Sequence, residues 1–193
     1  IRSDLDALER DGYMERTQGG AIQSMRNYYN MDFQHRKQEH MEKKRAIAAA
    51  AADMVQVGNT LFINSGTTTY FIAVELRKRK NLNIVTNSIS VAVELGDVPS
   101  FRVLLLGGEI NVQYSFTYGE TAREQLSHFR SDYAILSLDG ENPGTGLTTY
   151  HAEESVIDRT MMEQAKQTVI VADSTKLGHE SFSHVSELTS AIR

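Results

Sequence analysis

Apolar residues along the chain fall into short runs that alternate with longer helical patterns. The runs lie at residues 60–63, 82–86, 101–106, 133–138 and 168–172, and the helical patterns at about 68–79, 88–96, 120–128 and 152–166. Continuous apolar runs are typical of strands covered on both faces, because neither face meets water. Strands that alternate with helices form parallel sheets with helices on both faces. The pattern predicts an α/β domain with a mostly parallel sheet over residues 58–193.

The start of the chain has a different pattern. Ile1, Leu5 and Leu8 form one apolar stripe of a helix, and two short strand patterns then surround a glycine turn at residues 18–20. Residues 1–25 therefore predict a helix followed by a β-hairpin. This segment carries too little apolar surface to fold alone, so we expect its supporting helices to lie outside the chain.

Residues 26–57 connect the two parts. The first of them, up to residue 35, have weak periodicity and predict a linker, whereas residues 38–57 predict a long helix. This helix has an apolar face and a basic face, formed by Met41, Ala48, Ala51 and Val55 and by Lys43, Lys44 and Arg45 respectively.

Composition and charge narrow the classes of protein that fit. Of the 193 residues, 40% are hydrophobic and 23% are charged, which is ordinary for a globular domain. The net charge of -5 argues mildly against nucleic-acid binding, but residues 26–45 carry six positive and three negative side chains. A modest basic stretch of this kind is usually a solvated helix face, so the charge alone does not decide the class.

Several partners and sites are not expected. The chain has no cysteine, which excludes disulfides and thiolate chemistry and fits a reducing cytoplasm, where we expect the protein. No apolar run approaches the roughly 20 residues that cross a bilayer, so we expect no membrane contact. No two of the six histidines have the i, i+4 spacing of a metal-binding helix face, so we expect no metal site.

Candidate chemistry is expected where the strands end, because α/β sheets bind ligands beyond the carboxyl ends of their strands. The first such loop is Asn64-Ser65-Gly66-Thr67-Thr68-Thr69. A glycine lets the backbone approach a ligand, hydroxyl groups donate hydrogen bonds, and the following helix N-terminus attracts anions. The Gly-Lys-Ser/Thr ending of a Walker A loop is absent. We expect an anion site here; the alternative is that Ser65 or Thr67 only caps the helix.

The other strands also end in polar or glycine residues. The candidates are Thr86, Asn87 and Ser88, Gly108 and Glu109, Asp139 and Gly140, and Lys176. Together with residues 64–69 they predict a polar pocket with an anion end, with Glu109 and Asp139 binding hydroxyls and Lys176 as a cation. A phosphorylated sugar or polyol suits this chemistry. The alternatives are that residues 86–88 only cap a helix and that Asp139 and Lys176 only form a surface pair.

Several segments resemble one known family. IRSDLDALERDGYMERTQGGAI resembles the second half of the winged helix-turn-helix of DeoR-family bacterial repressors. NSGTTTYFIAVEL, VTNSISVAVEL, LLLGGEI and ADSTKLG resemble successive parts of the C-terminal sensor domain of that family. The resemblance implies a sensor fold similar to ribose-5-phosphate isomerase and CoA transferases, preceded by a partial winged helix-turn-helix. It also implies a sugar-phosphate effector and no cofactor.

The resemblance implies DNA contacts by Arg2 and Ser3 of the recognition helix and by Arg16 of the wing. Ser3 stands where the family usually has a second arginine, and Asp158 replaces the usual lysine of a later segment. We therefore expect a transcriptional repressor of carbohydrate metabolism, a homodimer or homotetramer that binds operator DNA and has no catalytic residues.

The alternative class is a sugar-phosphate isomerase that uses the same pocket. Asp139, Glu153 or Glu154 would then act as the general base, and Lys176 would stabilise the enediolate. The predicted helix and hairpin at the start of the chain favour the repressor, because an isomerase has no use for them.

Overall fold

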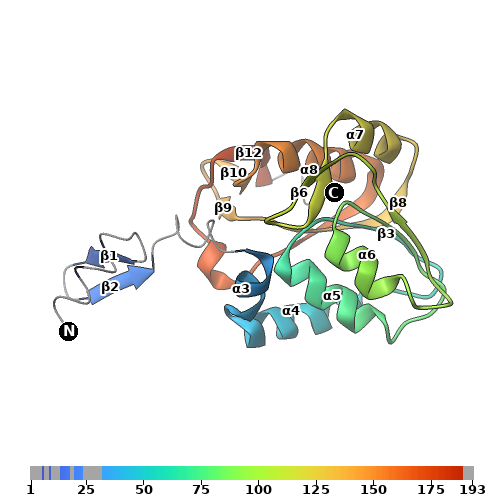
Figure 1. The fold of residues 1–193 in the computed structure, drawn as a ribbon, viewed down its shortest axis with the longest axis horizontal. Helices are drawn as coiled ribbons and strands as arrows, with labels where there is room; N and C mark the ends of the chain where they lie inside the picture. Colours follow the sequence, from blue (N-terminus) through green and yellow to red (C-terminus); the bar gives the residue numbers. More distant parts are fainter. Residues whose placement is uncertain (1–5, 7–8, 10–13, 18–19, 24–31, 189–193) are drawn as a thin grey trace.

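The structure is a computed structural model that describes residues 6, 9, 14–17, 20–23 and 32–188 (Figure 1). Of the predicted helix at the start of the chain, Asp6 and Glu9 are described and are helical, whereas Arg2 and Ser3 lie outside the described residues. Of the predicted hairpin, strand β1 (Met14–Thr17) pairs antiparallel with β2 (Gly20–Gln23), which confirms the two strands. Arg16 lies in β1, opposite Ala21.

A five-stranded parallel sheet forms the centre of the domain, as predicted. Its strands, in the spatial order β11-β8-β3-β4-β5, are β11 (Ala165–Val171), β8 (Ser131–Ser137), β3 (Thr60–Ile63), β4 (Asn83–Thr86) and β5 (Arg102–Leu105). All four pairings are parallel. Ile63 pairs with both Thr86 and Ile135, so the loops that follow β3, β4 and β8 leave the sheet at the same edge.

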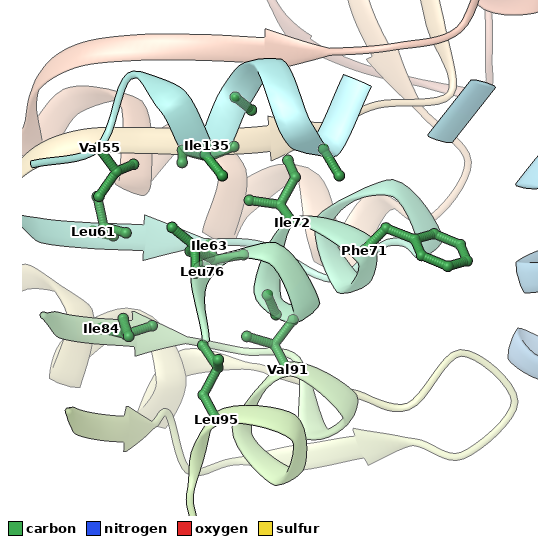
Figure 2. Packing of buried hydrophobic residues seen from close by; sticks show 14 of the residues in the cluster. Val55, Leu61, Ile63, Phe71, Ile72, Leu76, Ile84, Val91, Leu95 and Ile135 are labelled. Carbon is green, nitrogen blue, oxygen red and sulfur yellow. The ribbon is translucent and has the colours of Figure 1, made fainter. Parts of the chain in front are cut away.

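Helices cover both faces of this sheet (Figure 1). One face carries α4 (Met41–Asp53), α5 (Thr67–Leu76) and α6 (Ile89–Leu95), and the other carries α7 (Glu120–Ser127) and α8 (Ala152–Gln164). Alternate residues of β3 point to opposite faces: Leu61 and Ile63 pack with α4, α5 and α6 (Figure 2), whereas Phe62 packs with α7 and α8. The continuous apolar run of β3 therefore serves two cores.

Two small antiparallel sheets were not predicted. One is the hairpin of β6 (Glu109–Asn111) and β7 (Phe116–Tyr118), and the other contains β9 (Gly140–Asn142), β10 (Gly146–Thr149) and β12 (Ser183–Ser186). These strands are short and rich in glycine and polar residues, so no apolar run marks them.

The predicted linker and long helix differ from the structure. Residues 33–38 form a separate helix, α3 (Phe33–Gln38), so the linker cannot extend to residue 35. Asp32 caps α3 by accepting a hydrogen bond from the His35 N–H at 2.9 Å. His40 then adopts a left-handed backbone conformation with φ 51°, which separates α3 from α4. The second helix ends at Asp53 instead of residue 57.

Candidate functional site

The loop between β3 and α5 has the features of an anion site. Helix α5 starts at Gly66 without a side-chain cap from the described residues, so the alternative in which Ser65 or Thr67 caps it is wrong. A Cβ atom at Gly66 would lie 2.9 Å from the Cβ of Ser137, so only glycine fits this approach to β8. Within the described ranges, the hydroxyls of Thr67 and Thr68 make no hydrogen bond to the protein. The first turn of α5 therefore keeps donors available at its positive end.

A buried lysine lies beside this loop. The side chain of Lys44, on α4, is only 2% exposed, and its Nζ donates to the backbone oxygen of Arg36 at 2.5 Å. Lys44 lines a cavity with Thr67, Thr68 and Lys176. The prediction that Lys44 belongs to an exposed basic face is wrong, because α4 turns this residue toward the polar edge of the sheet.

Asp139, directly after β8, is the central carboxylate of the site. Its Oδ1 lies 3.3 Å from Arg36 Nη2 and 3.9 Å from Lys176 Nζ. Its Oδ2 accepts hydrogen bonds from the Tyr150 N–H at 2.9 Å and from the Thr149 hydroxyl at 3.2 Å. Asp139 and Lys176 are both buried, so the alternative of a surface pair is wrong.

Two adjacent cavities surround the Arg36–Asp139 pair. The Ser65 cavity, of about 20 Å³, is lined by Phe33, Arg36, Ser65, Gly66, Thr67, Tyr114, Ser137, Asp139, Thr149 and Glu154. The Lys44 cavity, of about 10 Å³, shares Arg36, Thr67, Ser137 and Asp139 and adds Lys44, Thr68, Leu138, Ala172, Asp173 and Lys176. Each cavity has room for only one or two water molecules, at roughly 10–15 Å³ each.

A buried pair of carboxyls lies on α8 beside these cavities. Burial raises the pKa of Glu154 well above its usual range, and the nearby Asp158 and Asp139 charges add to the effect. Burial also raises the pKa of Asp158 to about 7, although a hydrogen bond from Asn64 opposes the rise. Glu154 Oε1 and Asp158 Oδ2 have no hydrogen-bond partner among the described residues. A protonated Glu154 adds no negative charge to the Ser65 cavity and can donate a hydrogen bond into it.

The Asp158 carboxyl makes folding pH-dependent. Its pKa rises from 3.8 to about 7 on folding, so its stabilising contribution is complete below pH 3.8 and is lost as the pH rises through 7. In this window we expect Asp158→Asn to remove about 1.4 kcal/mol per pH unit from the pH dependence of the unfolding free energy. Urea unfolding at pH 5, 6 and 7 measures this. The exposed Asp53→Asn is the control, and an equal slope in Asp158→Asn and the wild type would contradict the assignment.

The structure brings together some of the predicted site residues. Those that line the two cavities are Ser65, Gly66, Thr67, Thr68, Asp139 and Lys176. Ten other residues that line the cavities were not among the predicted binding residues: Phe33, Arg36, Lys44, Tyr114, Ser137, Leu138, Thr149, Glu154, Ala172 and Asp173 (Glu154 was named only as a base in the isomerase alternative). Lys44 and Arg36 belong to the basic stretch before the sheet, and that excess of positive charge was the available signal.

The remaining predicted residues hold the scaffold. Asn64 bonds to both Ser137 and Asp158, and the Thr69 hydroxyl donates to the Asn64 oxygen at 2.9 Å. After β4, the Thr86 hydroxyl donates to the Ile63 oxygen. The other scaffold contacts are an Asn87 side-chain bond to the Thr117 oxygen and a Ser88 cap on the Val91 N–H, so Ser88 is a cap as its alternative stated.

Three further candidates lie at the small antiparallel sheets. Gly108 has φ 138°, and a Cβ atom there would lie 2.3 Å from the Tyr118 oxygen. Glu109 is exposed at the start of β6 and lines neither cavity. Gly140 starts β9, where a Cβ atom would meet the Thr148 hydroxyl at 2.5 Å. Each of the two glycines is therefore required by packing.

Buried charges of both signs line the two cavities. The cations are Arg36, Lys44 and Lys176, and the carboxyl groups are those of Asp139, Asp173 and Glu154. Among the described residues, no group of three or more His, Asp or Glu side chains could hold a metal ion. No helix in the described part of the chain is long and apolar enough to span a bilayer. The arrangement therefore suits an anionic ligand that also carries hydroxyl groups.

The structure has an α/β fold of the ribose-5-phosphate isomerase type. Ribose 5-phosphate isomerase from Plasmodium falciparum is similar in structure, with a TM-score of 0.52 and 17% identity over 70% of this chain and 52% of that one. The isomerase A of Methanocaldococcus jannaschii gives a TM-score of 0.53 and 14% identity, over 72% of this chain and 55% of that one. The chain thus spans about half the length of these enzymes, and the likeness concerns the fold alone.

The chain belongs to the DeoR family: the profile of the DeoR C terminal sensor domain matches residues 39–192. It is 33% identical to the HTH-type transcriptional repressor GlcR of Bacillus subtilis, over 97% of this chain and 72% of that protein. It is 31% identical to the glycerol-3-phosphate regulon repressor of Escherichia coli, over 98% of this chain and 75% of that protein. These similarities confirm the resemblance, and the named relatives are transcriptional repressors.

Proposed function

We propose that the protein is a transcriptional repressor whose sensor domain binds a phosphorylated sugar or polyol in the Ser65 and Lys44 cavities. The observation that carries this proposal is the buried Lys44 and Lys176 beside the uncapped start of α5. Two ammonium groups beside the positive end of a helix give a local potential that attracts an anion. A relative named for the glycerol-3-phosphate regulon supports the choice of phosphorylated ligand.

The residues divide into a phosphoryl end and a hydroxyl end. The phosphoryl group accepts hydrogen bonds from Thr67, Thr68 and the backbone N–H groups of the first α5 turn, and Lys44 and Lys176 neutralise it. Asp139, on the other side of the cavities, accepts from a sugar hydroxyl. The protein thereby recognises charge and hydroxyls in one ligand.

A binding role fits the carboxyl groups of the cavities better than turnover does. Asp139 already accepts from Arg36, Thr149 and Tyr150, and burial raises the pKa of Glu154 and so favours its neutral form, which makes neither a ready general base. We propose that the domain does not catalyse isomerisation. A coupled assay with ribose 5-phosphate tests this, and sustained turnover that is lost in Asp139→Asn would overturn it.

We propose that residues 1–25 belong to the DNA-binding head of a cytoplasmic homodimer or homotetramer. Arg2 and Ser3 would then face the major groove, and Arg16 would contact phosphates. Paired operator half-sites require paired heads, which is the reason for an oligomer. Operator binding by the full-length repressor that changes on addition of a phosphorylated sugar tests this part of the proposal.

Thr68→Ala tests the phosphoryl end. The expected result is roughly tenfold weaker binding of phosphorylated sugars, because a hydrogen bond to a charged group contributes about 1.5–3 kcal/mol. A ligand at a hundred times its Kd stabilises the wild type by about 2.7 kcal/mol, which a thermal-shift panel of sugar phosphates detects readily.

Thr121→Ala is the matched control for Thr68→Ala, since Thr121 is an exposed residue of α7. We expect this variant to bind like the wild type. If Thr68→Ala and Thr121→Ala bind phosphorylated sugars with equal affinity, the phosphoryl group does not bind at the loop after β3.

A further inference from the structure

Helix α3 reaches into the candidate site from the segment before the sensor domain. Its residues Phe33 and Arg36 are buried and line the Ser65 cavity together with the loop after β3. The family profile begins at residue 39, so α3 precedes the matched sensor domain. A ligand in this cavity would therefore contact a part of the chain that lies on the side of the predicted DNA-binding head.

Arg36 is the residue through which α3 enters the site. Its Nη2 lies 3.3 Å from Asp139 Oδ1, and its guanidinium carbon lies 4.7 Å from the centroid of the Tyr114 ring. Its backbone oxygen accepts from Lys44 Nζ. Arg36 lines both the Ser65 cavity and the Lys44 cavity, so its side chain occupies the boundary between them.

The space at the site requires a movement before a sugar phosphate can bind. The two cavities measure about 20 and 10 Å³, whereas pockets that enclose small organic ligands are typically roughly 300–1,000 Å³. Most of the cavity wall belongs to the sheet edge and to α5, which pack in the core. Helix α3 has six residues, and its contacts include a hydrogen bond from the Phe33 N–H to the Gln113 oxygen and the Phe33 ring against Tyr70. Movement of this short helix would enlarge the space.

Resting on the proposed function, we propose that the effector inserts between Arg36 and Asp139 and separates this ion pair. Its phosphoryl group binds the Arg36 guanidinium, which matches phosphate oxygens in bidentate geometry, and a hydroxyl binds Asp139. Arg36 follows the phosphoryl group and takes α3 with it. Occupancy of the sensor is thereby passed directly to the chain that precedes residue 33.

The ion pair also sets the ligand class. Separating a buried pair leaves two charges that must both find partners, since an unpaired buried charge is strongly unfavourable. Of the two separated charges, inorganic phosphate satisfies only Arg36, and an unphosphorylated sugar satisfies only Asp139. A molecule with both a phosphoryl group and a hydroxyl at sugar-like distance satisfies both ends, so we expect it to bind most tightly.

Arg36→Ala and Arg36→Lys test the phosphoryl contact. The probe is whichever of glycerol 3-phosphate, glucose 6-phosphate, fructose 6-phosphate and ribose 5-phosphate gives the largest thermal shift in the wild type. We expect Arg36→Ala to weaken its binding roughly 10- to 150-fold and Arg36→Lys to weaken it less, because lysine keeps the charge but not the bidentate geometry. Lys37→Ala, on the same short helix, is the control and should keep wild-type affinity.

The possible results separate the two proposals. If no sugar phosphate shifts the wild type, the proposed function itself fails. If Thr68→Ala loses the shift but Arg36→Ala binds as tightly as the wild type or more tightly, only the role of Arg36 is overturned. Melting of each ligand-free variant shows whether it folds, and Arg36→Lys provides the comparison if Arg36→Ala does not.

The relay is measured in the full-length repressor with its operator. The measured quantity is the factor by which the ligand changes the affinity for DNA. At ligand concentrations that saturate Arg36→Ala, we expect this factor to be much smaller in the variant than in the wild type. Ligand binding shifts another equilibrium only through contacts that differ between the two states, and this substitution removes the contact on α3. If the ligand changes the DNA affinity of the saturated variant as much as that of the wild type, ligand binding is not transmitted through Arg36 and α3.

Discussion

Replacing Lys44 by methionine is expected to weaken the binding of phosphorylated sugars roughly 10- to 150-fold, the equivalent of one charged hydrogen bond. Methionine keeps most of the aliphatic stem and removes the charge. Lys44 is buried in the same region as Arg36 and Lys176, so its removal also relieves repulsion between like charges. We therefore expect the ligand-free variant to melt no lower than the wild type while it loses the thermal shift.

Lys43→Met is the matched control, because Lys43 is exposed one residue earlier on the same helix and contacts only the Ser174 hydroxyl at 3.5 Å among the described hydrogen bonds. It should keep wild-type affinity in isothermal titration. If Lys44→Met binds as tightly as Lys43→Met, the buried lysine serves packing alone and the phosphoryl end of the site must lie elsewhere.

Replacing Asn64 by alanine is expected to lower the unfolding free energy by about 3–9 kcal/mol, at about 1–3 kcal/mol for each of the three groups left unpaired. The Asn64 side chain donates to the Ser137 oxygen at 3.0 Å and to Asp158 Oδ1 at 2.9 Å, and it accepts from the Ser137 N–H at 2.9 Å. These bonds join the ends of β3 and β8 at the edge that carries the site. Such a loss is a large fraction of the 5–15 kcal/mol typical of a domain.

Urea unfolding measures this change, with Asn83→Ala as the control. Asn83 is exposed at the start of β4, so its replacement should change stability by less than about 0.5 kcal/mol. A loss below 1 kcal/mol in Asn64→Ala would show that water replaces the lost amide and that the site edge does not depend on it.

The central sheet could be predicted because each of its strands is marked by a run of consecutive apolar residues. In β3, Leu61, Phe62 and Ile63 stand in one unbroken run, and both faces of that strand are covered by helices. Burial on both faces favours an unbroken apolar run, and that run identifies the strand. Strand β10 is buried as well, but it contains Gly146, Thr148 and Thr149, so no apolar run marked it and its pairing was not visible.

The site could be predicted only in part, for two physical reasons. Asparagine, serine and threonine both cap helices and bind ligands, so their presence after β3 and β4 could not show that Ser88 caps while Thr67 and Thr68 face a cavity. Lys44 and Arg36 are distant in sequence from these loops. Their burial depends on where α3 and α4 dock, and helical periodicity assumes that charged residues point outward.

The left-handed backbone at His40 divides residues 33–53 into two helices, so that a movement of α3 need not disturb α4. If residues 33–53 formed one continuous helix, a displacement of its first turn would also displace Ala48, Ala51 and Ala52, which are part of the core. The break at His40 instead makes α3, which carries Arg36, a helix separate from α4. If the ligand moves α3 as proposed, the packing of α4 in the core can stay in place.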